Sequence, residues 1–140
     1  MTVRSARLVL PGVAFWFVLA AIATSAGIVR ERWLVPSVGE LTAHQAGTLA
    51  VTAAFVAAIA VFVRHFRLTP DEALTIGLAW LAAAVMFEFG FGHYVDGLSW
   101  GRLLADYDIT RGRLLLLLWI AVGLGPFLLA HLLRADVHPR

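Results

Sequence analysis

Four long apolar blocks dominate the sequence and constrain its fold more than any other feature. Each is about 18 to 25 residues long, the length that crosses a hydrocarbon core of about 30 Å as a helix. The blocks cover approximately residues 8–30, 43–63, 71–94 and 113–133, with short charged segments between them. The sequence therefore predicts an all-α polytopic membrane protein, a single four-transmembrane-helix bundle made from the 140 residues.

The composition agrees with a membrane fold and excludes several classes of function. Hydrophobic residues make up 61% of the chain and charged residues 14%, whereas a soluble domain carries about 25% charged residues. The chain has no cysteine, which excludes disulfides and thiolate metal sites. The net charge of +2 is small and dispersed, so we expect the lipid bilayer, and no nucleic acid, as a partner.

The first apolar block resembles a secretory signal, because Arg4 and Arg7 precede it. However, the block runs from Leu8 to Val29, which is longer than the 7 to 15 apolar residues of such signals. We therefore expect a retained first span.

Local signals predict where the helices begin and end. The first helix should stop before Pro36, because the residue before a proline is disfavoured in the α conformation. Ser37 and Glu40 have the spacing of a capping box, which predicts that the second helix begins near Ser37. Thr69 and Pro70 predict the start of the third helix, with threonine as the cap and proline in the first turn.

A short amphipathic helix is predicted at the membrane interface before the fourth span. Its apolar residues recur at helical spacing and include the aromatic residues favoured at interfaces: Trp100, Leu103, Leu104 and Tyr107. The fourth helix should follow, capped by Asp108 or Thr110, with a kink near Pro126.

An even number of spans places both termini on one side of the membrane. The arginine count favours the cytoplasm for that side by a single residue. We expect a multi-pass protein of the inner (cell) membrane with both termini cytoplasmic.

Glu88 is the sharpest candidate for a functional residue. It lies in the third block, about six residues before its end, and thus roughly 9 Å below the interface. A carboxylate at that depth needs a partner, water or a proton. One interpretation is an ion pair with an arginine at a neighbouring helix end. The other is a proton acceptor, or a counter-charge for a cationic ligand.

Four arginines are the candidate partners, and they form two basic clusters on the face away from the termini: Arg30, Arg32, Arg111 and Arg113. Ordinary snorkelling towards lipid headgroups explains such clusters. If the bundle places them above Glu88, they could instead bind a phosphate or carboxylate group.

His93 is a second candidate for a ligand-binding or proton-linked residue. It follows Glu88 by five residues, about 140° around an ideal helix, so the two side chains should point to different faces. Glu40 and His44 share one face of the second helix. These four residues have the chemistry of a zinc or iron site, although helix capping and hydrogen bonding are simpler roles. The sequence identifies no other cofactor.

Two segments carry a family resemblance: GIVRERWLVP at residues 27–36 and FEFGFGHYVDGLSWGRLLADYD at residues 87–108. They resemble small four-span bacterial inner-membrane proteins with no assigned activity. The resemblance implies a membrane fold and no chemistry. The four-span multidrug exporters carry their membrane glutamate in the first helix, whereas Glu88 lies in the third.

Three classes of function fit the sequence. The first is a protein that binds or transports a small ligand or ion at the Glu/His/Arg cluster. Because four helices rarely enclose a path alone, this class implies a homo-oligomer. The second is a structural or accessory subunit of a larger membrane complex. The third is a membrane-embedded enzyme or metal protein.

Overall fold

The computed structural model describes residues 3–135 of the chain, and within that range it contains helices and no strands. The long helices are α1 (Val3–Val29), α3 (Glu40–Phe66), α4 (Pro70–Tyr94) and α6 (Leu115–Ala135). The short elements are η1 (Arg30–Leu34), α2 (Val35–Val38), α5 (Trp100–Ala105) and η2 (Ile109–Arg111).

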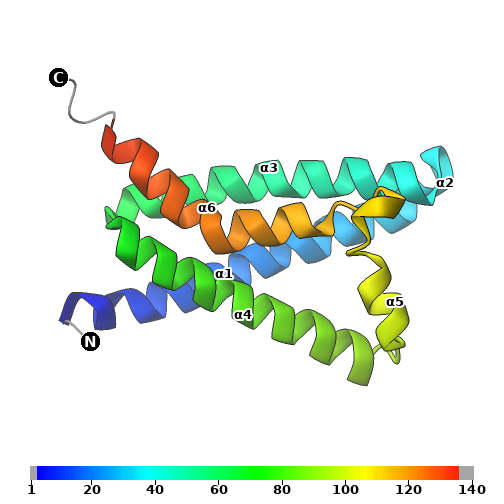
Figure 1. Ribbon diagram of the computed structural model, residues 1–140, viewed down its shortest axis with the longest axis horizontal. Coiled ribbons are helices and arrows are strands. Elements are labelled where there is room, and N and C mark those ends of the chain that lie inside the picture. Colours follow the sequence, from blue (N-terminus) through cyan, green and yellow to red (C-terminus); the bar gives the residue numbers. More distant parts are fainter. Residues whose placement is uncertain (1–2, 136–140) are drawn as a thin grey trace.

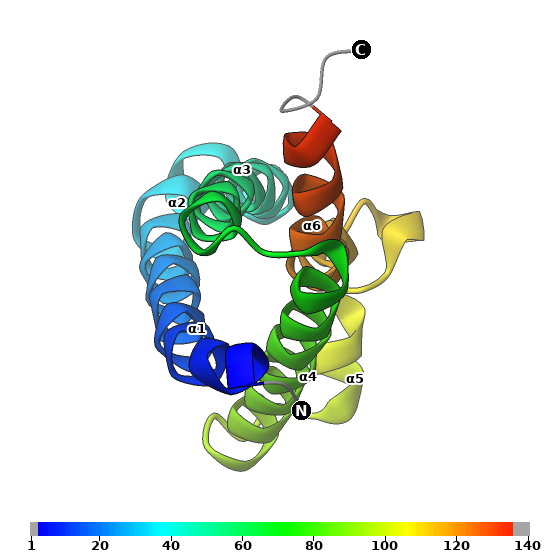
Figure 2. The same ribbon diagram turned by 90° about the vertical axis from the view of Figure 1, so that its left-hand side faces the viewer.

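The four long helices form a bundle in which α3 packs on α6 and α6 packs on α4 (Figures 1 and 2). The first and last described residues lie at one end, and α2 and α5 lie at the other (Figure 1). Each long helix is long and apolar enough to cross a membrane. The predicted all-α four-helix bundle is confirmed, and the chain has the architecture of a multi-pass membrane protein.

The first helix does not end before Pro36, and that prediction was wrong. The chain stays helical from α1 through the π-helical turn η1 into α2, which ends at Val38. Pro36 lies in the first turn of α2, where its missing N–H is tolerated. Gly39 then adopts a φ of 81°, which favours glycine, and turns the chain into α3.

The predicted capping box at Ser37 and Glu40 is also absent. The Ser37 hydroxyl donates to the Trp33 carbonyl oxygen at 2.6 Å. Gly39 occupies the cap position, so α3 begins at Glu40 and the Glu40 side chain takes no part in capping. It is therefore available for contacts with other helices.

The predicted start of α4 is confirmed. The Glu72 backbone N–H donates to the Thr69 hydroxyl at 3.2 Å, and the Thr69 N–H donates to the Glu72 carboxylate at 2.9 Å. Pro70 follows in the first turn. The short helix predicted before the last span is α5, which ends at Ala105, so Tyr107 lies just beyond it.

The last helix differs from its prediction at its start. Asp108 accepts the Thr110 N–H at 3.0 Å and so caps η2, and α6 begins only at Leu115. Pro126 lies inside α6, which bends along its length (Figure 1).

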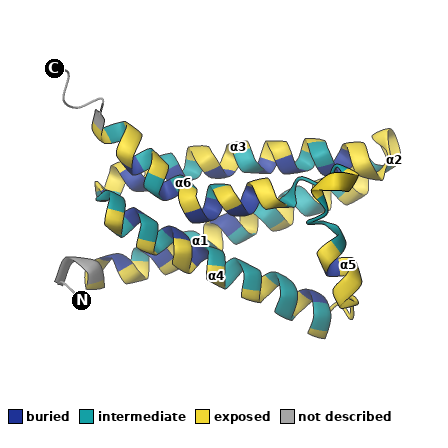
Figure 3. Ribbon diagram, in the orientation of Figure 1, coloured by how far each residue is buried: buried dark blue, intermediate teal, exposed yellow. Residues whose placement is uncertain are grey.

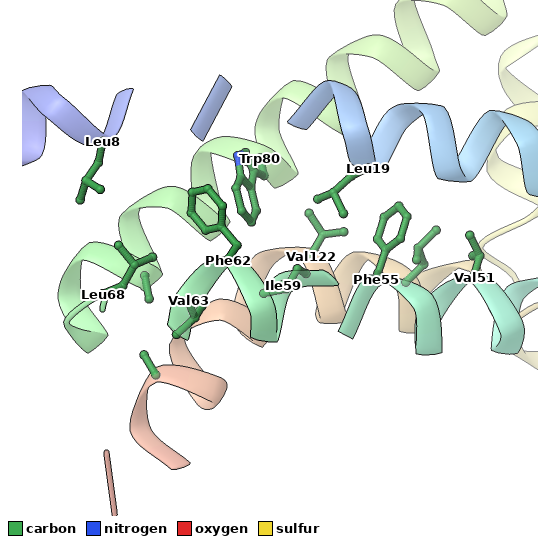
Figure 4. Close-up of a cluster of buried hydrophobic side chains, with 13 residues drawn as sticks. Leu8, Leu19, Val51, Phe55, Ile59, Phe62, Val63, Leu68, Trp80 and Val122 are labelled. Carbon is green, nitrogen blue, oxygen red and sulfur yellow. The ribbon is translucent and has the colours of Figure 1, made fainter. Parts of the chain in front are cut away.

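Buried residues lie on the inner faces of the long helices, while many residues of the outer surface are exposed (Figure 3). Near the termini, Phe15, Phe62 and Trp80 pack with ring centroids 4.6 to 5.3 Å apart. Figure 4 shows Phe62 beside Trp80, with Ile59 and Val122 further along the bundle. The Trp80 indole also donates to the Gly12 carbonyl oxygen at 2.8 Å, which fastens α4 to α1.

Two glycines let the backbones of α4 and α6 touch. A Cβ atom placed on Gly77 would overlap the carbonyl oxygen of Gly123, and one on Gly123 would lie 2.9 Å from the Leu81 side chain. Because a backbone carbonyl cannot move without shifting its helix, this contact requires glycine at position 77.

We expect the substitution Gly77→Ala to destabilise the bundle by about 1–3 kcal/mol, because the added methyl overpacks a backbone contact. Thermal unfolding in lipid nanodiscs measures the change. Gly90→Ala is the matched control in the same helix, since no atom lies within 4 Å of its added Cβ. Equal unfolding temperatures for the two variants would contradict the close contact.

Candidate functional site

Glu88 lies on the wall of a cavity that opens where α4 separates from the rest of the bundle. Towards its C-terminal end α4 diverges from α6, and α5 bridges the space between them (Figure 1). The cavity has a volume of about 460 Å³. We call it the Glu88 cavity, and its walls include Ala20, Ala23 and Gly27 of α1, Glu88 and Phe91 of α4, and Trp119 of α6.

The local sequence explains why the cavity is wide beside α1 and closed where α4 meets α5. The wall from α1 consists largely of small residues, among them Ala20, Ala23 and Gly27, whose side chains leave volume unfilled. Near the end of α4, Gly92 instead permits close packing between two helices. A Cβ atom there would lie 2.7 Å from the Leu103 side chain, so α5 sits directly on the α4 backbone.

Glu88 forms no ion pair with the side chains of residues 6–134, so the predicted pair with an arginine is not formed there. Three of the four candidate arginines are engaged elsewhere. Arg30 lies 2.8 Å from Glu31, Arg111 lies 3.1 Å from Asp108, and Arg113 lies 2.8 Å from Glu40. Arg32 is exposed on η1. A half-buried carboxylate thus faces the cavity without a cationic side chain.

Tyr107 and Trp119 lie next to Glu88, and their rings are parallel with centroids 6.4 Å apart. Burial raises the pKa of the Tyr107 hydroxyl, and the negative charge of Glu88 raises it further. The hydroxyl and the Trp119 indole nitrogen are buried and, within the described part of the chain, make no hydrogen bond of normal geometry. Glu88 is therefore close enough to Tyr107 to act on the phenol electrostatically.

Asp106 connects the Glu88 cavity to a group of ion pairs at its rim. This side chain lines the cavity and lies 3.5 Å from Arg102 and 3.4 Å from Arg113. Glu40 lies 3.7 Å and 2.8 Å from the same two arginines. The two guanidinium groups are shared between two carboxylates, which joins α3, α5 and the segment before α6.

His44 fixes the start of α6 from the neighbouring helix. It is 2% exposed, and its Nε2 accepts the backbone N–H of Leu114 at 3.2 Å. Its Nδ1 lies 3.4 Å from an Arg30 guanidinium nitrogen. One residue along, the Gln45 amide donates to the Gly112 carbonyl oxygen at 3.1 Å. The role of His44 in this arrangement is to supply a hydrogen-bond acceptor to α6.

His93 does not line the Glu88 cavity, and it fastens the end of α4 to the following loop. Its Nδ1 lies 2.8 Å from the Leu98 carbonyl oxygen and therefore donates to it. Its ring stacks on Trp100 with centroids 4.1 Å apart. Glu88 and His93 thus have separate surroundings, as their spacing on the helix predicts, and His93 adds no group to the Glu88 cavity.

The proposed metal set of Glu40, His44, Glu88 and His93 is not brought together either. Each histidine is held by a backbone group, and Glu40 is held by arginines. No three His, Asp or Glu side chains among the described residues have an arrangement that could hold a metal ion.

Sequence reasoning missed Tyr107 and Trp119 as neighbours of Glu88. The sequence pattern places Tyr107 in an interfacial helix, and Trp119 is not distinguished there from the other apolar residues of the last block. One signal was present, since Trp119 is the single side chain with a hydrogen-bond donor between Leu114 and Ile120.

We expect His44→Leu to cost about 1–3 kcal/mol of stability, because the Leu114 N–H loses its acceptor. His44→Gln should recover part of this loss, since an amide oxygen can accept the same bond. Thermal unfolding in nanodiscs and amide exchange at Leu114 measure both effects. The exposed His65→Leu is the control, and equal behaviour of all three variants would contradict the capping role.

We expect Glu88→Gln to lower the pKa of Tyr107, because it removes a negative charge that disfavours the phenolate. In a Tyr94→Phe background Tyr107 is the remaining tyrosine. Ultraviolet absorbance at about pH 11, above the ordinary tyrosine value of about 10, then measures the ionised fraction. That fraction should rise in Glu88→Gln and stay constant in the exposed control Glu31→Gln. If the ionised fraction stayed constant in both variants, the charge of Glu88 would have no effect on the pKa of Tyr107, and the prediction would be wrong.

The site thus combines a carboxylate without an ion pair to residues 6–134, a neighbouring phenol and cavity walls that are otherwise mainly apolar. Such a site can hold a molecule with an apolar body and a positive charge. Comparison of the chain with protein-family profiles, with curated proteins and with solved structures finds no match.

Proposed function

We propose that this membrane protein binds a small organic cation with an apolar body in the Glu88 cavity. The observation that carries the proposal is the half-buried Glu88 carboxylate, which faces the cavity with no ion pair to any side chain of residues 6–134. Charged groups inside a membrane bundle pair with an opposite charge or line a functional path. A bound cation supplies that opposite charge.

The size and walls of the cavity fit such a ligand. Its volume of about 460 Å³ falls within the 300–1,000 Å³ typical of small-molecule sites. Phe87 and Phe91 stack at 5.3 Å on one wall, and Trp16 meets Phe87 edge to face at 6.0 Å. The faces of aromatic rings attract cations, and the attraction strengthens when water is excluded.

The charges at the rim favour a cation over an anion. Arg102 and Arg113 are shared between Glu40 and Asp106, so their positive charge is compensated. Asp96 also lines the cavity and adds negative charge that this group of ion pairs does not compensate. The phosphate or carboxylate ligand considered from the sequence therefore finds a less favourable field here than an organic cation does.

Binding of ethidium, a permanently charged aromatic cation, tests the proposal. The protein in nanodiscs should bind ethidium saturably, measured by ethidium fluorescence. Glu88→Gln should weaken binding about tenfold, which corresponds to about 1.4 kcal/mol. Glutamine keeps the shape of the side chain and removes its charge.

Glu31→Gln is the matched control, because Glu31 is exposed on η1 and pairs with the adjacent Arg30. It should bind ethidium as the native protein does. If Glu88→Gln unfolds at the native temperature and binds with the native affinity, the carboxylate is not the ligand-binding group and the proposal fails.

A further inference from the structure

A second cavity lies between α1 and α4 on the side of the termini. Its volume is about 670 Å³, and its walls come from the first halves of the two helices. We call it the termini-side cavity, and its lining includes Leu8, Gly12 and Trp16 of α1 with Asp71, Ile76 and Ala83 of α4. It is lined mainly by apolar side chains and has carboxylates, among them Asp71, in the first turn of α4.

The two cavities follow one another along the same pair of helices. The helices α1 and α4 run in the same direction and cross obliquely (Figure 1), with the Trp80 to Gly12 hydrogen bond at their contact. The termini-side cavity reaches the first turn of α4, whereas the Glu88 cavity reaches Asp96 beyond the helix's last turn. Together they extend over the whole length of one membrane-spanning helix.

Trp16 stands between the two cavities and lines both of them. Its ring meets Phe87 of α4 edge to face, with centroids 6.0 Å apart. This contact spans the line along which α1 and α4 meet, which we call the seam. Its side chain is partly buried and packs against the edge of the hydrophobic core.

We propose that the seam between α1 and α4 is a path by which an organic cation crosses the membrane down its gradient, with Trp16 as the barrier. This inference rests on the proposed binding at Glu88. The carboxylates near both ends, Asp71 on one side and Asp96 on the other, attract cations to each mouth. Glu88 supplies the charge partner between them.

Uptake of ethidium into liposomes that enclose DNA measures this passage, since ethidium fluorescence rises when it reaches the DNA. Protein-containing liposomes should take up ethidium several-fold faster than protein-free ones.

Ala83→Phe fills the termini-side cavity and should reduce uptake to the protein-free rate. Ala83 does not line the Glu88 cavity, so ethidium binding in nanodiscs should stay within about twofold of the native protein. Ala82→Phe, at the neighbouring exposed position, is the control for both measurements.

Trp16→Ala removes the barrier and should raise the rate of uptake several-fold, whereas Trp33→Ala, at an exposed tryptophan of η1, should leave it unchanged. If ethidium binds but uptake equals the protein-free rate, the path is overturned and the binding function stands. Native uptake by Ala83→Phe also overturns the path. If ethidium does not bind the native protein, the proposed function fails and this inference fails with it.

Discussion

The contact between the α4 and α6 backbones at Gly77 and Gly123 determines the shape of the whole bundle. It draws the first half of α4 tightly against α6, and Trp80 fastens the same half to α1. The second half of α4 has no comparable contact, and it diverges until α5 and Leu103 meet it at Gly92. The Glu88 cavity is therefore a consequence of packing that is close at one end of a helix and open at the other.

The polar groups of the far end divide into two sets with different chemistry. In the first set, each charge is compensated: Glu40 and Asp106 hold Arg102 and Arg113, and this fixes α5 and the start of α6 to α3. The second set is Glu88 with Tyr107 and Trp119, where the carboxylate has no ion pair to residues 6–134 and the two donors make no hydrogen bond of normal geometry among the described residues. Burying a polar group without a partner costs stability. A ligand that supplies partners to the second set would therefore offset this cost and bind more favourably there than at the compensated ion pairs.

The number, type and approximate position of the long helices could be predicted from the sequence, because block length and apolarity are local properties. The start at Thr69 is equally local and was found. Glu40 was assigned to a cap because Ser37 has the right spacing, but its partner Arg113 lies 73 positions away. The neighbourhood of Glu88 depends on where α5 folds back, which places Tyr107 and Trp119 beside it. The residue pattern within one helix cannot predict such contacts, because they join residues from different segments.

The bond from Leu114 to His44 has a consequence for the order in which the chain matures in the membrane. The N–H that opens the last helix finds its acceptor 70 positions earlier, on a helix synthesised long before it. A last span inserted alone would carry an unsatisfied donor, and it reaches its full stability only when docked on α3. The docking of the last span on α3 therefore completes the hydrogen bonding of that span's own start.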